Sequence, residues 1–105
     1  MTNNPNTPDP NAFNNKYGDN PILRAASYGH TEVVKILAPL TDTPNVPNID
    51  GETPIHNAAC NGYTEIVKIL APLTENPNAP GNDGETPIYW AARSGHTEIV
   101  KILAT

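Results

Sequence analysis

Three histidines and one cysteine carry the most reactive side chains in this chain of 105 residues. Imidazole and thiolate groups bind zinc, and a histidine beside a cysteine or serine can activate a nucleophile. His30 and His96 each lie in a Gly-His-Thr-Glu sequence, whereas His56 follows Thr-Pro-Ile. Their spacing fits no metal-ligand set and no His–Cys pair with Cys60, and the sequence has no glycine-rich phosphate loop. We therefore expect no catalytic centre, no metal and no cofactor.

Composition argues against several classes of partner. Six basic and eleven acidic side chains give a net charge of −5, whereas binding to a phosphate backbone needs clustered Lys and Arg. The N-terminus has no apolar stretch that could serve as a signal peptide or membrane span. Cys60 stands alone, so it cannot form an internal disulfide, and we expect it to be an exposed bystander. These features favour an intracellular protein, cytoplasmic or nuclear, that binds neither nucleic acid nor membranes.

A nine-residue stretch that begins at Gly51 organises the rest of the chain. It reads Gly-Glu-Thr-Pro-Ile-His-Asn-Ala-Ala, returns from Gly84 with two changes and occurs in weaker form from Gly18. Its proline recurs every 33 residues. A fixed period of about 20 to 50 residues indicates stacked supersecondary units.

The first half of each unit has the sequence of a short helix. In the second unit Thr53 is a capping residue, and Pro54 is tolerated at the first helical position. Ile55, Ala58 and Ala59 then follow at helical spacing and form a narrow apolar stripe. A glycine just after the stripe is expected to end the helix.

The second half of each unit predicts a more deeply buried helix. It starts at Thr64-Glu65 in the second unit and is apolar apart from Glu65 and Lys68, which can pair on the exposed side. Pro39 and Pro72 are expected to stop or kink this helix. The Pro- and Asn-rich connection that follows is expected to form extended turns rather than regular strands.

These residues resemble the ankyrin repeat. The resemblance rests on Thr-Pro-Ile-His followed by Ala-Ala, and then on Gly-Tyr-Thr-Glu-Ile-Val-Lys-Ile-Leu, all in the second unit. It implies an all-α solenoid of stacked helix-turn-helix units with extended finger loops and gives the histidines structural roles in turns and helices. The expected organisation is a flexible leader at residues 1–17 and a repeat domain at 18–105, with units 18–50, 51–83 and 84–105. Alternatively, Phe13 and Tyr17 fold over the open side of the first unit.

A comparison of the second and third units predicts the binding residues. Over 21 aligned positions that start at Gly51 and Gly84, only five differ, and all five lie on the first helix or in the turn after it. Residues four apart share a helix face, so stacking aligns them in columns. The candidate partner-binding residues are Arg24, Ser27, Tyr28, Asn57, Cys60, Asn61, Trp90, Arg93 and Ser94.

The resemblance places these columns on the concave surface with which ankyrin proteins usually bind partners. Trp, Tyr and Arg are also the types enriched among interface hot spots. We therefore predict a non-catalytic protein-protein interaction module that binds another protein through this surface and the finger tips. Tyr28, Asn61, Trp90 and Arg93 should be accessible to solvent. Alternatively, the variation is drift on a tolerant surface.

Two other functions stay open. Near-identical units also suit a structural fragment or a duplicated or designed scaffold with no partner of its own. Asparaginyl hydroxylases modify ankyrin proteins at an asparagine eight residues after a leucine, and Asn45 and Asn78 have that spacing. However, Pro44 and Pro77 depart from the usual preceding residue.

The third unit lacks the polar substitutions that an end unit needs. Its second helix repeats that of the second unit, so we expect this end to present an apolar surface to water and to mediate self-association or stacking with further repeats. The sequence does not say which of the four apolar residues of the helix face outward. Those residues are Ile99, Val100, Ile102 and Leu103.

Overall fold

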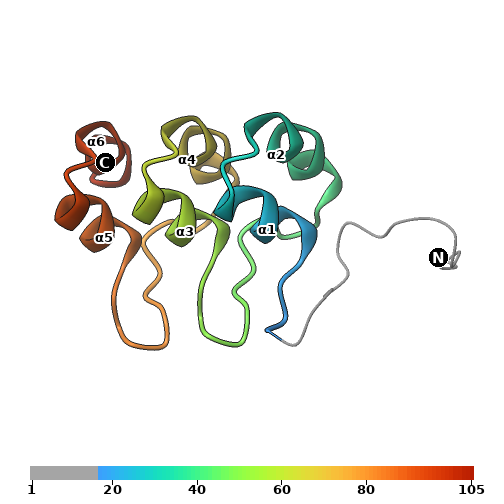
Figure 1. Cartoon of the computed structure of the whole chain (residues 1–105), viewed down its shortest axis with the longest axis horizontal. Coiled ribbons are helices and arrows are strands. Elements are labelled where there is room, and N and C mark those ends of the chain that lie inside the picture. The colour runs from blue at the N-terminus through green and yellow to red at the C-terminus, as the bar shows by residue number, and fades with distance from the viewer. Residues whose placement is uncertain (1–16) are drawn as a thin grey trace, which may run out of the picture.

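The computed structural model describes residues 17–105, which form three stacked helix-turn-helix units with loops that hang from one side (Figure 1). One row of first helices lies between a row of second helices and the finger loops. No strand occurs in residues 17–105, and the expected all-α repeat fold is confirmed. Of the expected leader at residues 1–17, the structure describes only Tyr17, and the expected placement of Phe13 lies outside the described residues. The elements in chain order are α1 (Pro21–Ser27), α2 (Thr31–Leu37), the 3-10 turn η1 (Ala38–Leu40), α3 (Pro54–Asn61), α4 (Thr64–Leu70), η2 (Ala71–Leu73), α5 (Pro87–Ser94) and α6 (Thr97–Leu103).

Side-chain caps fix where the first helices start. The Asn20 Oδ1 atom accepts a hydrogen bond from the Leu23 N–H at 2.9 Å, and Thr53 Oγ1 accepts one from the His56 N–H at 3.0 Å. Thr86 caps α5 in the same way. Each cap satisfies one of the amide groups that a helix start leaves without a partner. The predicted helix starts are therefore confirmed.

The second helices end where the prolines stand. Pro39 and Pro72 each stand two residues after the last residue of a seven-residue α-helix and lie in a short 3-10 turn, η1 or η2. A proline cannot donate the next helical hydrogen bond, so the helix tightens and stops. The Glu–Lys pairs of α2, α4 and α6 form as expected, with N···O distances of 3.1, 3.5 and 3.7 Å.

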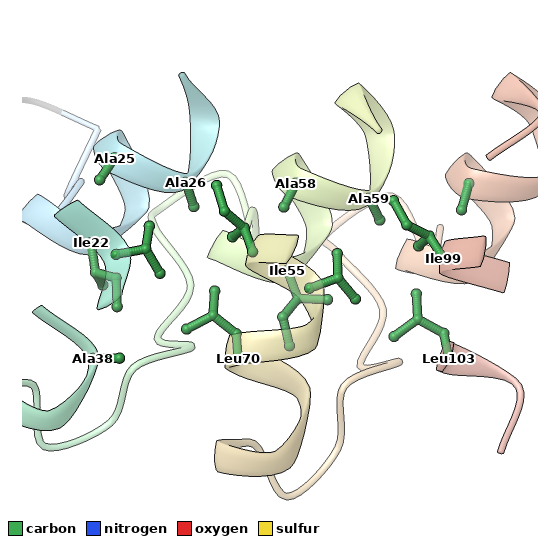
Figure 2. Packing of buried hydrophobic residues seen from close by; sticks show 14 residues of the cluster. Ile22, Ala25, Ala26, Ala38, Ile55, Ala58, Ala59, Leu70, Ile99 and Leu103 are labelled. Carbon is green, nitrogen blue, oxygen red and sulfur yellow. The ribbon is translucent and has the colours of Figure 1, made fainter. Parts of the chain in front are cut away.

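The core runs through the stack rather than through any one unit (Figure 2). Paired alanines on the first helices let neighbouring elements approach, and isoleucine and leucine side chains fill the space between them. Ala26 and Ala59 are fully buried, as are Ile55 and Leu70. Each unit therefore depends on its neighbours for its buried surface.

The outer face of the third unit exposes less apolar surface than expected. Ile99 is fully buried and Leu103 nearly so, because both side chains point back toward the second unit. Only Val100 and Ile102 are partly exposed. The apolar surface expected at this end is therefore limited, among these four residues, to Val100 and Ile102. Ala92 is also exposed, although its counterpart Ala59 is buried beneath the next unit.

The opposite end of the described stack exposes more apolar surface. Val33 is 44% and Ile36 64% exposed, while their counterparts in the second unit, Ile66 and Ile69, are buried and half-buried. These positions therefore face the preceding unit in the stack. Among residues 17–105, no unit covers Val33 and Ile36.

Backbone turns and contacts between fingers hold the loops in place. In the second finger the Asn48 N–H donates to the Glu52 carbonyl at 2.9 Å, and Gly81 and Glu85 repeat this bond in the third. The Asn82 side chain donates to the carbonyl of Ile49 at 2.9 Å and so joins the two fingers. These fingers present acidic residues beside the first helices.

Candidate functional site

Two clefts lie where the finger loops meet the first helices, and we call this surface the inner corner. The α1 cleft, of about 330 Å³, lies between α1 and α3, and the α5 cleft, of about 420 Å³, lies between α3 and α5. Glu52 and Asn57 line both clefts, so the two adjoin. The other residues of the α1 cleft are Tyr17, Asp19, Arg24, Ser27 and Tyr28. The α5 cleft is completed by Asp50, Gly51, His56, Cys60, Gly81, Asp83 and Trp90.

The inner corner brings together most of the predicted binding residues. Asn61, Arg93 and Ser94 are exposed on the same helices but line neither cleft. The Tyr28 side chain is 61% exposed, whereas Trp90 is half-buried in the wall of the α5 cleft rather than between the helix layers. The six residues that do line a cleft are Arg24, Ser27, Tyr28, Asn57, Cys60 and Trp90.

Each cleft has an aromatic ring with an arginine beside it. The Arg24 guanidinium carbon lies 5.5 Å from the centroid of the Tyr28 ring, and that of Arg93 lies 5.0 Å from the Trp90 ring. Tyr89 meets the Trp90 ring edge-on, with centroids 5.5 Å apart. A side chain that such contacts already order loses less entropy when it takes part in an interface.

Some of the predicted binding residues also join the units. The Asn57 side-chain amide donates to Ser27 Oγ at 2.8 Å, and Asn61 donates to the Ser27 carbonyl at 3.3 Å. Ser27 Oγ in turn donates to the carbonyl of Leu23 at 2.7 Å. Asn57 and Ser27 therefore have a structural use that does not depend on a partner.

The acidic residues of the α5 cleft and His56 were not among the predicted site residues. Burial lowers the pKa of His56 below its ordinary value, and the negative charges of Asp83 and Glu52 oppose that change. A hydrogen bond from the Glu85 N–H to Asp83 Oδ1, 3.1 Å long, lowers the pKa of Asp83. At neutral pH the cleft therefore combines the ionised Asp83 carboxylate with a neutral imidazole.

Comparison with protein families decides the identity of the fold. A family model described as ankyrin repeats in three copies matches residues 3–81 and 40–105. The chain belongs to the ankyrin-repeat family. No curated protein matches it. Ankyrin repeats generally mediate protein-protein interactions and are generally non-catalytic. The first match begins inside the segment expected to be a leader.

The ankyrin turns explain where two of the histidines lie. The Nε2 atom of His96 is 3.3 Å from the Cys60 carbonyl, and its ring lies against Gly62 of the preceding unit. His30 stacks on Tyr28, with centroids 6.1 Å apart. Cys60 is half-buried in the cleft wall rather than exposed as expected, because α5 packs beside α3. In the part of the chain that the structure describes, no three His, Cys, Asp or Glu side chains are placed to share a metal ion.

Both candidate hydroxylation residues are tied into the ankyrin stack. Asn45 Oδ1 accepts a hydrogen bond from the Ile55 N–H at 3.0 Å, and the Asn78 side-chain amide donates to the Leu103 carbonyl at 2.7 Å. Hydroxylation at either residue stays a prediction. A hydroxylase would have to draw the loop out and break the corresponding bond first.

None of the ankyrin helices between residues 17 and 105 has the length and apolar character that crossing a bilayer requires.

Proposed function

We propose that this ankyrin-repeat protein binds a partner protein through the inner corner. The observation that carries the proposal is the pair of adjoining clefts, which the first helices line with Trp, Tyr and Arg side chains. Such residues supply most of the binding energy where they fill or frame a pocket. The clefts also contain four of the finger carboxylates, which can set the orientation of the partner.

The double variant Tyr28→Ala with Trp90→Ala is expected to lose its partner. Each ring borders one cleft, so the two changes remove an anchor from both halves of the inner corner. We expect proteins that the wild-type chain captures from a cell lysate to be captured at least about tenfold less by the variant. Quantitative mass spectrometry of the captured proteins measures the change.

A matched double variant on the other helix row provides the control. Glu65 and Lys68 lie on α4, pair with each other and are exposed, so alanine at both sites alters an exposed surface without touching the inner corner. Its captured proteins should equal those of the wild type. Loss of the same proteins from this control, with the Tyr28 and Trp90 variant unaffected, would contradict the proposal.

A second candidate function is self-association, and it rests on the complementary ends of the described stack. Ala92 and Val100 repeat the surface that Ala59 and Val67 present to the third unit, while Val33 and Ile36 occupy the positions that pack against such a surface. Two copies can therefore stack head to tail. Because such contacts do not close on themselves, larger assemblies form as concentration rises.

Sedimentation velocity tests the self-association of the 105-residue chain. We expect the mean sedimentation coefficient to rise between about 10 µM and about 1 mM, and Val100→Glu to remove that rise. The control is Ile49→Glu, because Ile49 is 65% exposed at a finger tip away from the third unit's outer face. A clean monomer at every concentration would contradict this function. Ile99→Glu is a poor test, since Ile99 is buried.

A further inference from the structure

The charged side chains that line the α5 cleft are all acidic. Carboxylates from two finger loops line it, namely Asp50, Glu52 and Asp83. No lysine or arginine is among the residues that line it in the described part of the chain. A cleft that collects one sign of charge attracts groups of the opposite sign and raises their local concentration.

The Trp90 ring also favours positively charged groups in this cleft. Its electron-rich face attracts cations, and the Arg93 guanidinium carbon already lies 5.0 Å from the ring centroid. Arg93 does not line the α5 cleft. The α5 cleft is therefore lined by the Trp90 ring, which already has one cation, the Arg93 guanidinium, over its face.

His56 shows that the cleft contains an unmet polar group. The residue is only 8% exposed, its side chain lies in the cleft wall, and its Nδ1 atom is buried without a hydrogen-bond partner. An unsatisfied buried polar atom costs stability, and a donor that reached the Nδ1 atom would recover part of that cost. Since burial keeps this imidazole neutral at pH 7, it adds no positive charge that would repel a cation.

We propose that the α5 cleft receives the cationic side chain of a lysine or arginine from an exposed segment of the partner protein. The inference rests on the proposed function, because it names the chemistry of a partner held at the inner corner. The distribution of charge favours it over a free cation. The lysines of the described chain, Lys35, Lys68 and Lys101, lie on α2, α4 and α6 and pair there with glutamates. A basic protein surface can therefore approach the acidic fingers without meeting these ammonium groups. The two arginines of the described chain, Arg24 and Arg93, lie over the Tyr28 and Trp90 rings, and neither lines the α5 cleft.

Trp90 allows a direct measurement, because it is the one tryptophan in the chain and it lines this cleft. The probe is the peptide acetyl-Gly-Gly-Lys-Gly-Gly-amide. A second peptide with norleucine in place of lysine keeps the aliphatic stem and lacks the ammonium group. We expect the lysine peptide to change the Trp90 fluorescence with a dissociation constant on the order of 1 mM, and the norleucine peptide to bind at least about tenfold more weakly. Raising the ionic strength from about 50 to 500 mM should weaken the lysine peptide further.

Charge-neutral variants identify the carboxylates that act. Glu52→Gln keeps the oxygen that accepts from the Asn48 amide, and Asp83→Asn keeps the oxygen that accepts from the Glu85 N–H, so both variants preserve the finger turns. Each is expected to weaken the lysine peptide about fivefold. Glu98→Gln removes the same charge from an exposed site on α6 and should change nothing.

Three results would overturn the inference: no saturable response, an equal response to norleucine, or unchanged affinity in both carboxylate variants. Tighter binding of spermidine than of lysine peptides would overturn the assignment to a protein side chain. Partner capture that needs Tyr28 and Trp90, without any binding of the lysine peptide, would overturn this inference and leave the proposed function standing. If the Tyr28 and Trp90 variant captured the same proteins as the wild type, both this inference and the proposed function would be overturned.

Discussion

The variant Ile66→Ala is expected to lose about 2–5 kcal/mol of unfolding free energy. Ile66 lies on α4, is fully buried and occupies the position that faces the preceding unit. Alanine would leave a cavity that the close-packed neighbours cannot fill. Because each unit draws its buried surface from its neighbours, we expect the loss to appear in the unfolding of the whole stack. Urea denaturation followed by circular dichroism measures it.

The first unit contains a control of the same chemistry. Ile36→Ala removes the same atoms from α2, where the isoleucine side chain is 64% exposed. Its unfolding free energy should stay within about 0.5 kcal/mol of the wild type. Equal losses in the two variants would show that Ile66 does not pack as the structure places it.

The sequence predicted the fold because its signals are local and recur at a fixed spacing. Thr53 followed by Pro54 predicts the start of α3, and Pro72 predicts the end of α4. Neither signal depends on knowing what the helix packs against. The 33-residue period then predicts the stack, since three similar units must present similar faces to one another.

The same reasoning could not say which apolar residues of the third unit face outward. In α6 four of seven residues are apolar, and they surround most of the helix. Which of them point back toward the second unit depends on how the helix rows cross, and this places Ile99 and Leu103 inside and Val100 at the edge. Helix periodicity alone carries no information on that crossing.

The candidate site was predicted in part for a related reason. Comparing units finds residues that differ, such as Trp90 in place of Asn57, but it cannot find a group that is the same in each unit. Asp50 and Asp83 are such a pair, and they enter the site only because stacking brings the two fingers to one cleft. The net charge of −5 was the available signal, and it does not say where the charge collects.

A second large effect is expected for Gly51→Ala, and it tests how closely the fingers pack. Gly51 has φ of +80°, a conformation that costs an alanine about 1–2 kcal/mol. A methyl group there would also lie 2.5 Å from the backbone nitrogen of Asn82 in the next finger. Backbone cannot rotate away as a side chain can, so we expect the crowding to add about 1–3 kcal/mol.

Gly84→Ala separates the two causes, because it changes the equivalent glycine of the third finger. Gly84 has φ of +84°, and within residues 17–105 nothing lies within 4 Å of a methyl group at this site. This variant should therefore lose only the conformational cost of about 1–2 kcal/mol. Urea denaturation gives both losses, and the amide resonance of Asn82 should move in the Gly51 variant alone. If the two variants lost the same free energy and Asn82 did not respond, the fingers would not approach as closely as the structure places them. The α5 cleft, which takes Asp50 from one finger and Asp83 from the other, would then be wider than described.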